Sequence, residues 1–114
     1  MLETNGKITY GGRDYILVFN LNVMEEIQNE YGSISKWGEL TDNQEEPDAK
    51  AVKFGFMCML NEGIDIENEK NHTDTPYLTA KQVGRMLTEI GLDRASQALN
   101  QTVIDSTKTD EKNG

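Results

Sequence analysis

Two side chains of this sequence could form a nucleophile and its base: the only thiol, Cys58, and the only imidazole, His72. A paired cysteine and histidine can carry covalent catalysis. Cys58, however, lies among Phe54, Met57 and Met59, and apolar burial raises the pKa of a thiol and leaves it inert. We therefore expect a packed cysteine, a solvated histidine and no catalytic residue.

The acidic residues Asp65, Glu67 and Glu69 alternate along the chain, with Glu62 before them and Asp74 after them. Calcium favours oxygen-rich loops, but an EF-hand loop needs its ligands at fixed positions around a central glycine, and this order is missing. A zinc site needs about four thiolate or imidazole ligands, more than the chain has. The sequence therefore predicts a solvated acidic loop, with no metal and no cofactor.

The composition limits the compartment and the partners. The chain has 114 residues, a formal net charge of −9 and one cysteine. This charge works against binding to nucleic acid, and a single cysteine excludes an internal disulfide and suits a reducing compartment. The longest apolar runs are about five residues, whereas a membrane span needs about 18. We expect a soluble cytoplasmic protein that binds neither nucleic acid nor membrane.

Two stretches rich in β-branched and aromatic residues, 7–10 and 15–19, flank Gly11 and Gly12. Glycines between two such stretches are typical of a β-hairpin, because they adopt the positive φ that a tight turn requires. A hairpin is not stable alone and needs a helix across one face. We expect the following helix to cover it.

That helix is predicted at residues 22–31, directly after the second strand. Asn20 or Asn22 can accept a hydrogen bond from its first free amides, and Gly32 can end it. A strand that runs straight into a helix is a rigid corner, so the remaining elements are expected to pack on it.

The rest of the chain predicts an α+β fold, with the N-terminal β-hairpin packed on a small bundle of about four helices. A single domain is expected over residues 1–105, and a polar, disordered tail over 106–114. A short helical turn is expected at 33–40, with Ser33 or Ser35 as its cap, followed by a helix from about 48 to 62 that Gly63 closes. A polar loop is expected at 64–75. A helix at 79–90 is opened by a Thr79–Gln82 capping box and ended at Gly91, and a last helix is expected at about 93–105.

The helix at 48–62 is apolar nearly all round, and this is the main functional signal. Phe54, Met57 and Cys58 lie away from its principal apolar face, beside the small residues Ala51 and Gly55. One interpretation is that a central helix is buried on all sides. The other is a partner-binding patch, since flexible methionines suit surfaces that hold varied apolar sequences and small residues let another helix approach.

Trp37 is a second candidate anchor, because a lone tryptophan is often either a core residue or an interaction hot spot. The predicted partner-binding residues are therefore Trp37, Phe54, Met57 and Cys58. The same apolar helix predicts self-association into a homo-oligomer.

Several motifs in order resemble the small tail assembly chaperones of long-tailed bacteriophages and prophages. They are a Gly-Lys start and hairpin, Leu-Val-Phe-Asn-Leu-Asn at 17–22, Met-Glu-Glu-Ile at 24–27, Tyr-Gly-Ser-Ile at 31–34, Thr-Ala-Lys-Gln-Val-Gly at 79–84 and Ile-Gly-Leu at 90–92. The similarity covers about residues 5–105 and is one of pattern, without an invariant chemical signature.

The resemblance implies a non-enzymatic role in virion morphogenesis. Proteins of this family are made in the bacterial host cytoplasm, coat the long tape measure protein, help to bring tail tube protein subunits to it and are usually absent from the mature virion. Many such phages also make a longer, frameshifted form, and this chain would correspond to the short form. A contact of this kind is expected to survive salt and to be broken by Met57→Asp or Phe54→Asp.

An alternative is an acidic regulatory protein that occupies a basic surface on a phage or host protein. The charge of −9 would then carry the binding, and the complex would weaken steeply as salt is added. An enzyme would need a polar constellation in a pocket, which one histidine and one packed thiol do not supply.

Overall fold

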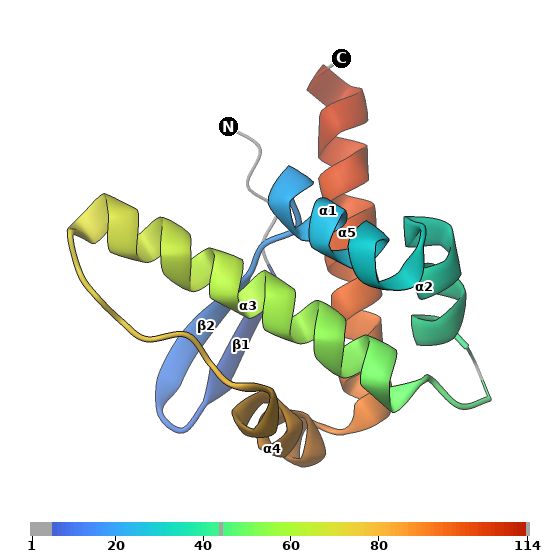
Figure 1. The fold of residues 1–114 in the computed structure, drawn as a ribbon, viewed down its shortest axis with the longest axis horizontal. Coiled ribbons are helices and arrows are strands. Elements are labelled where there is room, and N and C mark those ends of the chain that lie inside the picture. The colour runs from blue at the N-terminus through green and yellow to red at the C-terminus, as the bar shows by residue number, and fades with distance from the viewer. Residues whose placement is uncertain (1–5, 44, 114) are drawn as a thin grey trace.

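The computed structural model describes residues 6–43 and 45–113 (Figure 1). An antiparallel two-stranded hairpin is followed by five helices, so the predicted α+β class is confirmed with one helix more than expected. The elements are β1 Gly6–Tyr10, β2 Arg13–Leu17, α1 Leu21–Tyr31, α2 Ile34–Thr41, α3 Ala49–Asn71, α4 Ala80–Ile90 and α5 Leu92–Asn113.

The hairpin turn contains only Gly11 and Gly12. Their φ angles are 60° and 77°, and two consecutive positive φ values match the type I′ turn that the right-handed twist of a hairpin favours. Tyr10 therefore pairs with Arg13. The second strand begins earlier and ends earlier than the sequence predicted, at Leu17 rather than Phe19.

The corner between β2 and α1 is fastened to two other helices. Asn20 is the N-cap of α1, and its carboxamide oxygen accepts from the amide of Val23 at 3.2 Å. The carboxamide nitrogens of Asn20 and Asn22 both donate to Glu62 of α3, at 2.8 and 3.0 Å. On the other side, the hydroxyl of Ser106 in α5 donates to the carbonyl of Phe19 at 3.2 Å. These hydrogen bonds fix the angle at which the chain leaves the hairpin.

The sequence predicted that the central helix α3 ends at Gly63, but the helix continues to Asn71. A Cβ at Gly63 would lie 2.6 Å from the carbonyl oxygen of Ile16, so this glycine allows α3 to approach β2 closely. His72 is the C-cap of the helix, and its φ of 55° places it in the left-handed region. The predicted loop over 64–75 is therefore mostly helix, and the acidic residues in it lie on α3.

Two asparagines of α3 hold the chain that connects it to α4. The Asn61 side chain donates to the carbonyl of Leu78 and accepts from its amide, at 3.1 and 2.8 Å. Two turns further on, Asn68 pairs in the same way with the carbonyl and amide of Thr75, at 2.9 and 3.0 Å. Thr79 then opens α4 with the predicted capping box.

The last helix, α5, extends through residues 106–113, where the sequence predicted a disordered tail. Ser106 bonds to Phe19, and the hydroxyl of Thr107 donates to the carbonyl of Val103 at 3.1 Å. A formed helix adds residues at little cost once it is nucleated, so α5 carries the polar sequence onward.

Candidate partner-binding surfaces

Trp37 lies in the core and is only 1% exposed. Its indole N–H donates to the carbonyl of Ala51 at 3.0 Å, and a Cβ at Gly55 would lie 2.5 Å from the Trp37 ring. The small residues of α3 thus do admit another helix, but it is α2 of the same chain. The ring fills the space between α2 and α3, so of the two alternatives for Trp37 the structure favours a core residue over a partner anchor.

Cys58 is also buried, with 7% of its surface exposed. Burial raises the pKa of its thiol above the ordinary value, and a hydrogen bond with the Glu26 carboxylate raises it further. His72 is 14 residues away at the other end of α3, roughly 21 Å along the helix axis. The expectation of a packed thiol is confirmed, and Cys58 offers little surface to a partner.

Phe54 and Met57 are the two predicted contact residues that retain exposed surface, since both are half-buried. The Phe54 ring packs edge-on against Tyr31 of α1, with 5.8 Å between the ring centroids and 69° between the planes. Between residues 51 and 64, the interpretation of this helix as buried on nearly all sides is therefore closer to the structure, and a narrow stripe remains open.

This α3 stripe consists of the residues between positions 50 and 65 that are not buried. From the N-terminal end it carries two lysines, two large apolar side chains, an amide and two carboxylates: Lys50, Lys53, Phe54, Met57, Asn61, Glu62 and Asp65.

The carboxylate end of the stripe borders an acidic hollow of about 180 Å³. Its lining comes from α1, α3 and the connection to α4: Glu26, Met57, Cys58, Asn61, Glu62, Asp65 and Tyr77. The Tyr77 hydroxyl donates to Asp65 at 2.8 Å, and this bond, together with the neighbouring carboxylates, raises the pKa of Tyr77. Within residues 6–43 and 45–107, no group of histidine, cysteine or acidic side chains is arranged to hold a metal ion.

A larger groove lies where α3, α4 and the start of α5 meet, and it extends to the connection between α2 and α3. It consists of two adjoining hollows of about 320 and 280 Å³ that share Ala49 and Leu92. The first is lined by Ala49, Lys53, Gly84, Leu87, Thr88 and Leu92, and the second by Leu40, Asn43, Glu46, Pro47, Asp48, Ala49 and Leu92. We call their union the α3–α4–α5 groove.

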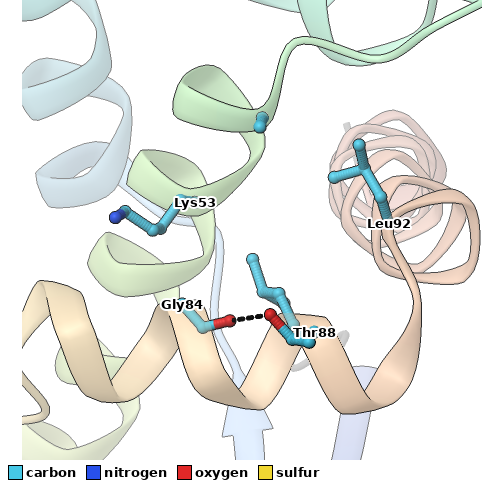
Figure 2. A pocket seen from close by; sticks show the side chains of 6 residues that line it. Lys53, Gly84, Thr88 and Leu92 are labelled. Carbon is cyan, nitrogen blue, oxygen red and sulfur yellow. Dashed lines mark hydrogen bonds between the residues drawn. The ribbon is translucent and has the colours of Figure 1, made fainter.

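Figure 2 shows the first hollow of the groove, with Lys53 at one side and Leu92 at the other. The Thr88 hydroxyl donates to the carbonyl of Gly84 at 2.9 Å, so this potential donor is satisfied by its own helix. The first hollow therefore offers mainly apolar contact area, whereas the second also carries Asn43, Glu46 and Asp48. The sequence does not predict this groove, because its residues come from separate elements and none of them is unusual alone.

No protein-family model, curated protein or solved structure matches this chain. In the part of the chain that the structure describes, no helix is both long enough and apolar enough to cross a membrane.

Proposed function

We propose that this protein is a non-enzymatic phage tail assembly chaperone, which binds the tape measure protein in the host cytoplasm, keeps it soluble and helps to recruit tail tube subunits. The order of its sequence motifs resembles that family, as described above. The observation that carries the proposal is the α3–α4–α5 groove, whose first hollow is an apolar surface open to solvent on a strongly acidic protein.

The groove suits an apolar stretch of a long polypeptide. Leu92 and Ala49 join its two hollows, and Leu40 at its far end is 37% exposed. Covering such side chains contributes about 25 cal/mol for each Å² of apolar surface removed from water. A single contact of this size is weak, but several copies along one tape measure protein would hold it by avidity.

The net charge of −9 serves the same role. A polypeptide with exposed apolar stretches aggregates, and a coat of acidic domains keeps the particles apart by repulsion. The chaperone would thus cover apolar surface with its groove and face the solvent with its carboxylates.

Affinity capture from phage-producing cells tests the proposal. The tagged chain is captured at two salt concentrations, and the bound proteins are identified by mass. We expect a very long, coiled-coil-rich protein or a tail tube subunit at both concentrations, because apolar contacts are little affected by screening.

Variants locate the contact. Thr88 is exposed in the groove, so Thr88→Glu places a charge on the binding surface and is expected to abolish capture. Gln97→Glu, at an exposed position of α5 outside the groove lining, is the matched control. The sequence alone predicted that Met57→Asp breaks this contact. With the contact placed in the groove, Met57→Asp is instead expected to leave capture intact, and loss with Met57→Asp but not with Thr88→Glu would place the contact on the α3 stripe.

The acidic hollow favours a second candidate function, an acidic regulator that binds a basic surface. Glu26, Glu62 and Asp65 converge there, and such a cluster would attract lysine or arginine side chains of a partner. Capture of a basic phage or host protein at low salt alone, with loss on Glu26→Gln, would support this function and contradict the chaperone proposal.

A further inference from the structure

The α3 stripe has an order of charges that is complementary to its own reverse. Lys50 and Lys53 lie at one end, Glu62 and Asp65 lie at the other, and Phe54 and Met57 lie between them. Lys50 and Asp65 are both exposed and lie on the same open face as Phe54, Met57 and Asn61, whereas Lys53 lies beside Gly84 of α4 and Glu62 on the opposite flank, beside Asn20 and Asn22.

Neither end of the stripe is neutralised within the fold. Among residues 6–43 and 45–107, the one ion pair is Lys7–Asp14, on the hairpin. Glu62 accepts from the amides of Asn20 and Asn22, and Asp65 accepts from the Tyr77 hydroxyl. These neutral donors orient the carboxylates and leave their charges uncompensated. In Figure 1, α3 crosses the view between α1 and α4 with no other element in front of it.

We propose that a second copy of this chain packs antiparallel along the α3 stripe and forms a twofold-symmetric dimer. With the symmetry axis between positions 57 and 58, Met57 packs near Met57 of the partner subunit. Lys50 then faces Asp65 of the partner subunit, and Phe54 lies near Asn61 of the partner subunit. The span from Lys50 to Asp65 is roughly 22 Å, and two helices that cross at about 20° stay in contact over such a length.

The charge order selects this occupant over others. A uniformly basic helix on the open face would be attracted by Asp65 but repelled by Lys50, and a uniformly acidic one would meet the reverse. A parallel second copy would place like charges opposite each other. An antiparallel copy satisfies both ends at once, and a twofold axis repeats each favourable pair. The inference does not depend on the proposed function.

Sedimentation velocity of the purified chain from about 1 to about 500 µM tests the dimer. The wild-type chain is expected to pass from monomer to dimer in this range. Lys50→Glu places two carboxylates opposite each other twice in the dimer, and Asp65→Lys does the same with two lysines. Each single variant is therefore expected to raise the dimer dissociation constant by at least about tenfold.

The decisive sample is an equimolar mixture of Lys50→Glu and Asp65→Lys. In the mixed dimer, Glu at position 50 of one chain faces Lys at position 65 of the other, and the second pair is native, so association is expected to return to near the wild-type level. Recovery on mixing also shows that both variants are folded. Lys70→Glu on the exposed end of α3 and Asp74→Lys on the connection are charge-matched controls, and both are expected to dimerise normally.

A wild-type chain that stays monomeric at every concentration would overturn the proposal. So would a dimer that weakens equally with the control variants, or a mixture that associates no better than its two components. Because the experiment contains this protein alone, its outcome is separate from that of the capture experiment.

Discussion

At the scale of single residues, the polar side chains of α3 act as fasteners between distant parts of the chain. The carboxamide of Asn61 both donates to and accepts from the backbone of Leu78, as a paired residue of a neighbouring strand would. Glu62, the next residue, collects two amide donors from the corner before α1. Hydrogen bonds of this kind contribute about 1 kcal/mol each when formed and cost more when one partner is left without the other.

Replacing Asn61 with alanine is expected to lower the free energy of unfolding by about 1–3 kcal/mol, because the half-buried amide and carbonyl of Leu78 lose their partner. Urea unfolding followed by circular dichroism measures this. Asn29→Ala, at an exposed position of α1, is the control and is expected to gain a few tenths of a kcal/mol from helix propensity. Equal stability of the two variants would contradict the fastening role of Asn61.

The Cys58 thiol is expected to react at least about a hundredfold more slowly with a thiol reagent at pH 8 in the folded protein than in urea. Burial raises its pKa from the ordinary value of 9.0, so the thiol stays protonated in the native state. The unfolded chain ionises Cys58 near that ordinary value, and its contribution to stability is therefore lost as pH rises above about 9. A native-state reaction rate equal to that in urea would show that Cys58 is accessible.

At the scale of elements, α3 is positioned by glycines that remove steric barriers. Gly55 faces the Trp37 ring of α2, and Gly63 faces the carbonyl oxygen of Ile16 in β2. A glycine inside a helix usually weakens it by about 1 kcal/mol relative to alanine. Here the loss is offset by burial of the neighbouring elements, which could not approach α3 as closely over a methyl group.

Gly63→Ala is expected to destabilise the protein by about 1–3 kcal/mol, because its Cβ would lie 2.6 Å from backbone that cannot move aside alone. Gly38→Ala in α2 is the matched control, since nothing lies within 4 Å of its Cβ position. The control is expected to stabilise the protein by about 0.5–1 kcal/mol through helix propensity. Thermal or urea unfolding of both variants would settle the sign, and a stabilising Gly63→Ala would contradict the close approach of α3 to β2.

At the scale of the whole molecule, repulsion between like charges dominates the electrostatics. The chain carries a net charge of −9, and the single ion pair among residues 6–43 and 45–107 joins Lys7 to Asp14, two side chains that are both more than half exposed. Such surface pairs add little stability. The compact state therefore concentrates negative charge that the unfolded chain spreads out.

Raising the salt concentration from about 0.02 to about 0.2 M is expected to raise the melting temperature by a few degrees, because the Debye length falls and screens this repulsion. Glu25→Gln, at an exposed position of α1, is expected to raise the melting temperature at low salt and to have less effect at high salt. Differential scanning calorimetry at low protein concentration measures both effects. A melting temperature that falls as salt is added would mean that attraction dominates instead.

The sequence determines where most helices begin and where some end, because capping and helix termination depend on local interactions. Ser33, Asp48 and Thr79 cap α2, α3 and α4, and Gly32 and Gly91 end α1 and α4. These assignments depend on neighbours within a few residues, so the sequence contains all that is needed to make them.

Tertiary structure decided what those helices do. Gly63 predicted a helix end in the sequence, but in the structure it lies within α3 and leaves room for the carbonyl of Ile16. In the sequence, the apolar residues Trp37 and Cys58 are compatible with either a partner surface or the core, and the structure shows that both are buried in the core. The α3–α4–α5 groove has no sequence signature because it exists only where three elements meet. Burial and cavity shape depend on contacts between residues far apart in the chain, and periodicity along one helix does not report which of its faces a neighbour will cover.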